Sequence, residues 1–171
     1  MDEGIDRMAS DIQFSDSDVF FDLGSGIGNV CDRIFKTSDI RKCVGIEYDE
    51  DRYLESVPLS SEHGRRKLAF IHGNFMHQDW SEATVLFMDS IMFSDKTLRE
   101  IEHKALTTCP NLRYLISMKK MPSDTKLAHL KTVPVNASWG LSQYHMYDTS
   151  PYIRPSPRID TPVRYINYMG L

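Results

Sequence analysis

Residues 19–28 read VFFDLGSGIG, the pattern of a strand that leads into a glycine-rich turn. The apolar run from Val19 to Phe21 predicts a buried strand. The chain then passes through an acid, Asp22, into a turn with glycines at positions 24, 26 and 28. Glycine permits the dihedral angles of a sharp strand-to-helix turn and lets a ligand approach the backbone. Because ligands of open α/β sheets bind where the strands end, we expect a ligand site at this turn.

A second apolar run, CVGIEYD from Cys43 to Asp49, also leads to an acid. This acid, Glu47, lies 19 residues after Gly28. A carboxylate at this place can accept hydrogen bonds from the two hydroxyls of a ribose. The two strand ends together indicate a cofactor of the nucleoside type.

The spacing of the glycines separates two kinds of nucleoside cofactor. Dinucleotide enzymes have the pattern G-x-G-x-x-G, whereas this chain has G-x-G-x-G, with Asn29 where the third glycine would stand. A carboxylate such as Asp22 would also repel a phosphate. S-adenosylmethionine has an ammonium group and no phosphate, so the local charge favours this cofactor over a dinucleotide.

The composition limits the class of protein. A length of 171 residues, 41% of them hydrophobic and 26% charged, fits one globular domain. Three widely spaced cysteines without a C-x-x-C pair favour an intracellular protein, and no secretory leader or membrane span is expected. The net charge of −4 predicts no strong nucleic-acid surface. Histidines and cysteines show no metal-ligand spacing, so we expect no metal site.

Apolar runs alternate with helix-like spans, which is typical of an α/β protein with a doubly wound, mostly parallel sheet and helices on both faces. Seven strands are expected, at 19–23, 42–47, 67–72, 84–88, 113–117, 130–135 and 143–147. Helices are expected at 29–37, from about 49, and at 97–106 after a cap at Ser94-Asp95. The predicted domain covers 19–149. It lies between an acidic segment, 1–18, and a Pro- and Tyr-rich arm, 150–171, that packs on the domain or on a second copy in a homodimer.

Two further strand ends carry candidate site residues. After the third strand, Asn74 can hydrogen-bond the edge of an adenine while Phe75 stacks on its face. The alternative is a plain turn with Phe75 in the core. After the fourth strand, Asp89 and Ser90 would lie beside the reactive centre of the cofactor, or instead would cap the helix that follows.

The order of these segments carries a family resemblance. DLGSGIGNV, GIEYD, IHGNFMHQDW, VLFMDSIMF, LISMKKMP and ASWGLSQYHMY follow one another between about residues 14 and 149. In this order the chain resembles the catalytic core of the disruptor-of-telomeric-silencing (Dot) histone-lysine methyltransferases. The resemblance implies a Rossmann-like class I methyltransferase fold with a reversed last strand. It further implies methyl transfer from S-adenosyl-L-methionine to a protein lysine, with a histone or nucleosome as partner in the nucleus.

The resemblance also implies roles for individual residues. Those assigned to the cofactor are Asp22, Gly24, Ser25, Gly26 and Gly28 around the methionine end, Glu47 at the ribose, and Asn74 and Phe75 at the adenine. Those assigned to transfer are Asp89 and Ser90 beside the methyl group, with Phe93, Trp139 and Tyr144 along a lysine channel.

The chain departs from the family at three places. The family has Asp-Phe in place of Asn74-Phe75 and a pair of asparagines in place of Asp89-Ser90. It also has a long segment before the first strand, where this chain has 18 residues. Two other functions therefore stay open: an RNA or small-molecule methyltransferase on the same fold, and a cofactor-binding module without transfer activity.

Overall fold

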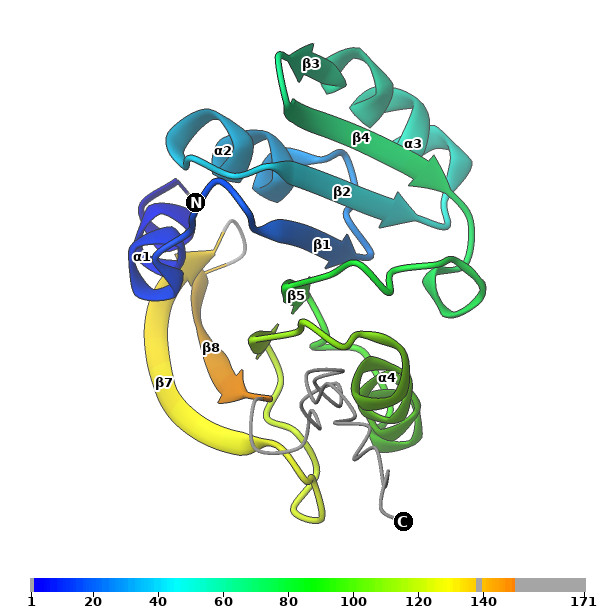
Figure 1. Cartoon of the computed structure of the whole chain (residues 1–171). Coiled ribbons are helices and arrows are strands. Elements are labelled where there is room, and N and C mark those ends of the chain that lie inside the picture. The colour runs from blue at the N-terminus through cyan, green and yellow to red at the C-terminus, as the bar shows by residue number, and fades with distance from the viewer. Residues whose placement is uncertain (1, 138–139, 150–171) are drawn as a thin grey trace, which may run out of the picture.

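The computed structural model describes residues 2–137 and 140–149, which form a central sheet between two layers of helices (Figure 1). The helices are α1 (Asp2–Ile12), α2 (Asn29–Thr37), α3 (Glu50–Ser56) and α4 (Asp95–Thr108), with short 3-10 turns η1 (Val57–Leu59) and η2 (Phe75–His77). The strands are β1 (Val19–Leu23), β2 (Lys42–Glu47), β3 (Ser61–His63), β4 (Arg66–His72), β5 (Val85–Met88), β6 (Tyr114–Ser117), β7 (Ala128–Ala137) and β8 (Gly140–Asp148). None of the helices in this described part is long and apolar enough to cross a membrane.

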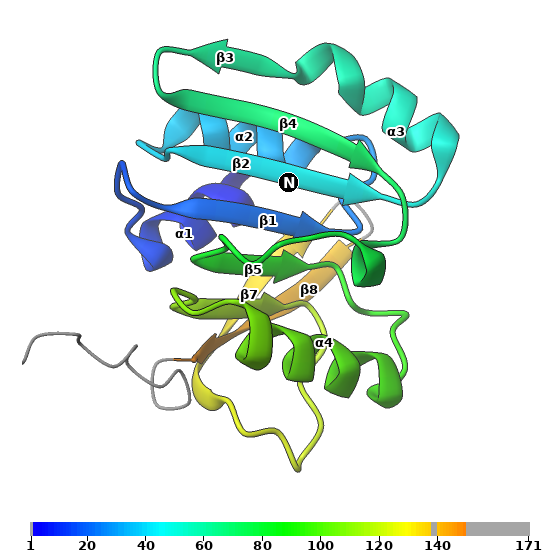
Figure 2. The same ribbon diagram turned by 45° about the vertical axis from the view of Figure 1, so that its right-hand side comes forward.

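The sheet has the order β3-β4-β2-β1-β5-β6-β8-β7. Strands β4, β2, β1, β5 and β6 run parallel, whereas β8 runs antiparallel to both of its neighbours, β6 and β7. The Rossmann-like class I arrangement and the reversed last strand are therefore confirmed. All seven expected strands are present, and Figure 2 shows α4 in front of the sheet with α1 and α2 behind it.

The prediction of seven strands was short by one. Strand β3 is a three-residue edge strand that pairs antiparallel with β4. Its sequence, Ser61–His63, has no apolar run, so no strand pattern marks it. It forms because the chain reverses at Gly64, whose φ of 62° suits glycine.

Period-two alternation along β1 decides which way the first acid faces. Val19, Phe21 and Leu23 pack in the core beneath α4, whereas Phe20 packs in the core beneath α1 and α2. Asp22 therefore faces the α1–α2 side of the sheet. The same side holds the cavity described below.

The acidic segment 1–18 forms α1 and packs on the rest of the domain. Ile5, Met8 and Ile12 of α1 are buried in the core formed with α2 and β7. Their spacing of three and four residues makes one apolar face on a helix, while the acids of the segment occupy the other positions. The predicted arm, 150–171, lies outside the described residues.

Candidate active site

The glycine turn after β1 has the backbone geometry that its sequence predicts. Gly24, Gly26 and Gly28 all have positive φ, at 92°, 54° and 87°. A Cβ added at Gly24 or Gly26 would meet no atom within 4 Å, whereas one at Gly28 would come within 2.6 Å of the Phe70 ring. The first two glycines thus leave room for a ligand, and the third permits close packing of the turn on β4.

Glu47, at the end of β2, holds this turn in place. Its Oε2 accepts a hydrogen bond from the backbone N–H of Gly26 at 2.7 Å, and its Oε1 accepts one from Asp49 at 2.9 Å. Glu47 is buried and does not line the cavity. The assignment of Glu47 to the ribose stays a prediction. It requires each carboxylate oxygen to accept a hydrogen bond from a ribose hydroxyl in addition to the one from the backbone.

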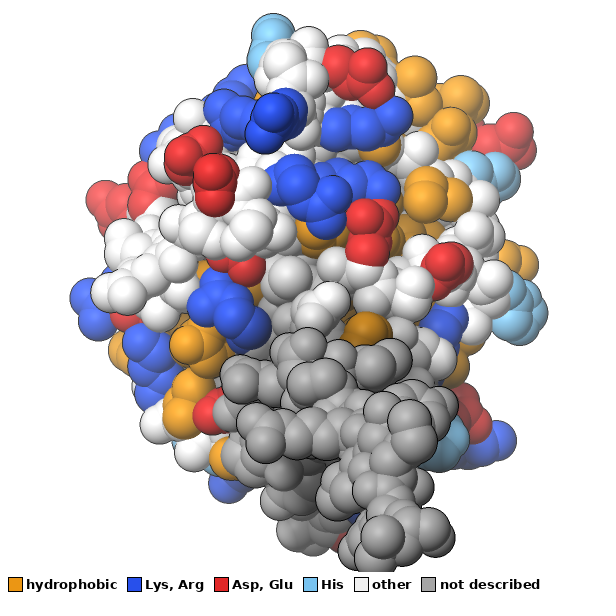
Figure 3. Space-filling view, in the orientation of Figure 1, with side chains coloured by type: hydrophobic (Ala, Val, Ile, Leu, Met, Phe, Trp, Pro, Cys, Tyr) orange, Lys and Arg blue, Asp and Glu red, His pale blue; other side chains and the backbone are white. Residues whose placement is uncertain are grey.

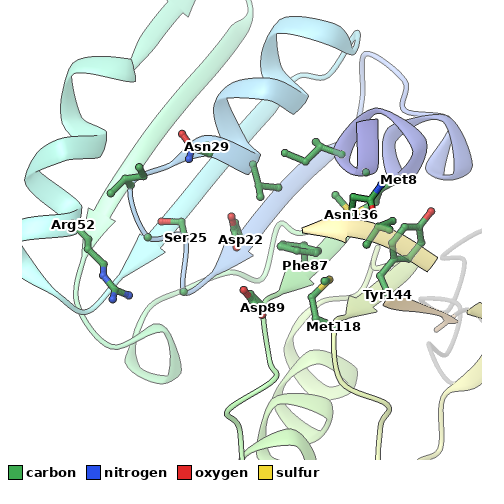
Figure 4. Close-up of a pocket in the computed structure, with 17 residues that line it drawn as sticks. Met8, Asp22, Ser25, Asn29, Arg52, Phe87, Asp89, Met118, Asn136 and Tyr144 are labelled. Atoms are coloured by element: carbon green, nitrogen blue, oxygen red, sulfur yellow. The ribbon is translucent and has the colours of Figure 1, made fainter. Parts of the chain in front are cut away.

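A cavity of about 270 Å³ extends from the glycine turn to α1 and the β7–β8 hairpin (Figure 4). On the side of the turn it is lined by Asp22, Gly24, Ser25, Gly26, Ile27, Asn29, Val30 and Arg52. On the other side it is lined by Gly4, Ile5, Met8, Phe87, Asp89, Met118, Val135, Asn136 and Tyr144. Figure 4 shows Asp22 and Asp89 at the ends of β1 and β5, with Met8, Asn136 and Tyr144 across the cavity from the turn.

Two buried polar atoms in the cavity wall lack a hydrogen-bond partner in the described part of the chain. They are Oδ1 of Asp22, whose residue is 2% exposed, and Oγ of Ser25, whose residue is 8% exposed. Burial, together with the negative charges of Asp89 and Glu47, raises the pKa of Asp22 to about 8. An unpaired buried oxygen is costly, so a ligand with hydrogen-bond donors fits here. The ammonium group of S-adenosylmethionine is such a donor.

Asp89 follows β5 and lines the same cavity. Phe87 of β5 pairs in register with Asp22 of β1. Asp89 therefore lies two residues beyond the level of Asp22 on the neighbouring strand. Asp89 is exposed to the cavity mouth, and partial burial raises its pKa even though a hydrogen bond from the backbone of Ile91 opposes the shift. The two acids thus belong to one site.

Ser90 was expected beside the methyl group or, alternatively, in a helix cap. In the structure it does not line the cavity, and it does not cap α4. Its side chain is fully buried, 2.5 Å from Oγ of Ser117, and accepts a hydrogen bond from the backbone N–H of Lys119 at 3.1 Å. These bonds join the ends of β5 and β6 away from the cavity. The cap of α4 is Ser94, whose Oγ accepts from the N–H of Thr97 at 3.1 Å.

Asn74, Phe75 and Phe93 do not line the cavity. Oδ1 of Asn74 accepts a hydrogen bond from the N–H of Met76 at 2.9 Å and so caps η2. Phe75 stacks on Phe93 with ring centroids 5.7 Å apart, and both pack against the core beneath α4. The plain turn, with Phe75 against the core, is the arrangement seen. The roles of Asn74 and Phe75 at an adenine and of Phe93 in a lysine channel stay predictions.

Tyr144 lines the cavity, but its hydroxyl points to α1. Its Oη donates to Oδ2 of Asp11 at 2.6 Å, and Lys131 pairs with the other carboxylate oxygen of Asp11 at 2.8 Å. These contacts bind α1 to the β7–β8 hairpin. Trp139, the other aromatic residue expected here, lies outside the described residues.

Sequence patterns missed the α1 side of the cavity. Ile5 and Met8 are apolar residues three positions apart, a spacing that marks a helix face, but the surrounding acids hid it. Met118 and Asn136 carry no local signal, because only the sheet order brings them near the glycine turn. No group of three histidine, cysteine or acidic side chains within 2–137 and 140–149 is arranged to hold a metal ion.

Comparison with known proteins identifies the family. The profile of the family described as "Histone methylation protein DOT1" matches residues 1–150. The chain belongs to this family. A protein-lysine N-methyltransferase of Saccharolobus islandicus (strain REY15A) is 32% identical over 83 residues, a match covering 48% of this chain and 52% of that protein. The match therefore spans about half the length of that relative.

Solved structures agree on the fold of this DOT1-family chain. An RNA methyltransferase from Salinibacter ruber, in complex with S-adenosyl-L-homocysteine, superposes with a TM-score of 0.68 at 23% identity, over 90% of this chain and 93% of that one. Magnesium protoporphyrin IX methyltransferase from Synechocystis PCC 6803, with bound S-adenosylmethionine, gives 0.63 at 11% identity, over 86% and 76%. The chain thus combines membership of the DOT1 family with the fold of class I methyltransferases.

Proposed function

We propose that this chain transfers a methyl group from S-adenosylmethionine to the side-chain amine of a protein lysine. The observation that carries the proposal is the unpartnered, buried Asp22 carboxylate above a turn that Gly24 and Gly26 leave open. The family description and the lysine-modifying relative support lysine as the target. By the same family description we propose a histone as the protein substrate and the nucleus as its compartment.

The residues of the chain serve mainly to bind and align the reactants. Asp22 and Ser25 offer acceptors to the ammonium of the cofactor, and Glu47 orders the turn beneath it. The bound cofactor supplies an electrophilic methyl group on a positively charged sulfur. A lysine ammonium must lose a proton before its nitrogen can attack this methyl group. Beyond that step, transfer needs alignment and exclusion of water more than acid–base groups. Apolar side chains such as Phe87 and Met118 provide the water-excluding wall.

The alternative is an RNA substrate, which the structural similarity to the RNA methyltransferase from Salinibacter ruber suggests. The charge distribution disfavours it, because Lys and Arg side chains on the face in Figure 3 are interspersed with acids. Lys42 and Arg41 both pair with Glu82, and Lys67 pairs with Glu62. Paired bases release few counterions when a polyanion binds, and that release supplies much of the affinity for nucleic acids.

The cofactor is tested by thermal unfolding. S-adenosylmethionine or S-adenosylhomocysteine at 100 times its dissociation constant should raise the free energy of unfolding by about 2.7 kcal/mol, whereas NAD should have no effect. Labelled-methyl assays on histones, nucleosomes and RNA then identify the acceptor. Stabilisation by NAD alone, or transfer to RNA alone, contradicts the proposal.

The Glu47→Ala variant tests the loop that holds the cofactor. Because the N–H groups of Gly26 and Asp49 lose their charged acceptor, we expect stability to fall by about 1–3 kcal/mol. Cofactor affinity should fall by a similar amount as the turn loosens and the ribose loses its acceptor. Titration calorimetry measures the affinity, and Glu55→Ala, at an exposed position on α3, is the control. Unchanged affinity in Glu47→Ala would show that the turn and ribose roles are wrong.

A further inference from the structure

The cavity carries two acids that have no basic partner. Asp22 and Asp89 form no ion pair with any residue in the described part of the chain, and the charges that act on Asp22 are those of the acids Asp89 and Glu47. Lys119, the base that follows β6, is directed elsewhere. Its Nζ donates to the carbonyl of Phe93 at 2.8 Å and pairs with Asp95 at 3.1 Å.

The remaining base at the cavity is Arg52 of α3, which is exposed and lies across the glycine turn from Asp89 (Figure 4). Phe87 and Met118 lie beside Asp89 and give the cavity an apolar wall there (Figure 4). An uncompensated carboxylate beside apolar walls favours a ligand that combines a positive charge with an aliphatic stem.

The cofactor accounts for one of the two acids. Asp22 is buried, its Oδ1 has no partner in the described part of the chain, and the residue lines the cavity beside the glycine turn, where we place the cofactor ammonium under the proposed function. Asp89 also lines the cavity, but it is exposed and therefore lies nearer to solvent than Asp22. This carboxylate is left for the acceptor.

We infer that Asp89 is a specificity-determining residue that binds the ammonium group of the acceptor. The site thereby takes a primary amine on an aliphatic chain, as in lysine, and rejects an uncharged ring nitrogen. The inference rests on the proposed function. The family resemblance leads us to expect an asparagine at this position. The inference gives a role to the negative charge that Asp89 has and asparagine lacks.

The test is a binding comparison in the presence of saturating S-adenosylhomocysteine. The probes are the peptide Gly-Gly-Lys-Gly-Gly and the same peptide with norleucine, which keeps the aliphatic stem and lacks the charge. Wild-type protein should bind the lysine peptide at least about tenfold more tightly, the lower range for a hydrogen bond to a charged group. Asp89→Asn, which keeps the size of the side chain, should remove this preference while the variant still binds S-adenosylhomocysteine.

Methyl transfer gives a second readout. In Asp89→Asn the KM for the lysine peptide should rise about tenfold, with a smaller change in kcat. Asp39→Asn is the control, because it removes the same charge at an exposed position before β2, at the opposite edge of the sheet. Melting temperatures of both variants should stay close to wild type.

The outcomes distinguish a failure of the inference from a failure of the proposed function. A lysine preference that survives in Asp89→Asn overturns the role of Asp89, while methyl transfer to the peptide would still support the proposed function. Wild-type protein that binds S-adenosylhomocysteine but does not distinguish the two peptides also overturns the inference. Wild-type protein that fails to bind S-adenosylhomocysteine contradicts the proposed function, and the inference falls with it.

Discussion

Asp22 shows at the scale of one residue how a site is maintained at the expense of stability. Its Oδ1 is buried without a partner, and burial together with Asp89 and Glu47 raises its pKa to about 8. An ordinary aspartate in the unfolded chain ionises near pH 4. Between these two values the unfolded chain has lost the proton that the folded chain keeps, so rising pH favours unfolding. The residue is thus suited to a cationic ligand and unfavourable to the fold alone.

Asp22→Asn should therefore stabilise the protein while weakening the cofactor. Asparagine does not ionise, so the variant avoids the loss of stability that wild type suffers as the pH rises from about 4 to about 8. The gain in the free energy of unfolding should therefore be larger at pH 7.5 than at pH 5. Denaturant unfolding at the two pH values measures this difference, and calorimetry with S-adenosylmethionine should show reduced affinity. A variant that is less stable than wild type at both pH values would contradict the assignment.

At the scale of one element, α1 acts as a wall of the site as well as part of the core. Met8 is 2% exposed and lines the cavity, and Gly4 lets the helix approach β7 so closely that an added Cβ would lie 3.2 Å from Cβ of Val135. The carboxylate of Asp11 then ties the helix to Tyr144 and Lys131. Any loosening of α1 should therefore affect both stability and the cavity.

Met8→Ala tests this double role. Removing a buried side chain of this size should lower the free energy of unfolding by about 2–4 kcal/mol and weaken cofactor binding as the wall recedes. Met92→Ala is a matched control, because Met92 is 91% exposed and should change stability by less than about 0.5 kcal/mol. Thermal and urea unfolding measure both. Equal effects of the two substitutions would show that α1 is not packed as described.

At the scale of the whole molecule, one buried acid joins the starts of three strands at the edge opposite the site. Asp18 precedes β1 and is 2% exposed. Its carboxylate accepts hydrogen bonds from Ser15, from Oγ1 of Thr84 before β5 at 2.7 Å, and from Arg113 before β6 at 2.8 Å. Burial opposes ionisation, but the hydrogen bonds from Thr84 and Ser15 and the charge of Arg113 outweigh it and lower the pKa of Asp18.

Asp18→Asn should cost about 2–3 kcal/mol at pH 7, because hydrogen bonds to a charged group are lost. Since the pKa of the folded state is lowered, this contribution is present above the ordinary value near 4 and is lost as the pH falls through the folded-state pKa. The deficit of the variant relative to wild type should therefore shrink in acid. Unfolding experiments from pH 7 to pH 3 check this. A deficit that does not depend on pH would mean that the charge of Asp18 contributes nothing.

The central sheet, the glycine turn and the class of cofactor were predictable from the sequence, because these depend on local features. Apolar runs mark β1 and β2, positive φ requires Gly24 and Gly26, and an acid at a strand end lies at the ligand edge whatever surrounds it. Helix α2 was predicted at its observed bounds, Asn29–Thr37, for the same reason. β3 escaped prediction because pairing with β4, and not its own side chains, makes it a strand.

The residues that close the site could not be predicted from the sequence, because they meet only through tertiary packing. The cavity joins Asp22 to Met8 and Tyr144, residues on three elements that meet through packing of α1 on the β7–β8 hairpin. Tertiary structure likewise separated Asp89, which faces the cavity, from its neighbour Ser90, which is buried against Ser117. Two adjacent polar residues look equivalent in a sequence, but they point in different directions where the chain leaves a strand, and each meets the neighbours that the sheet order brings there.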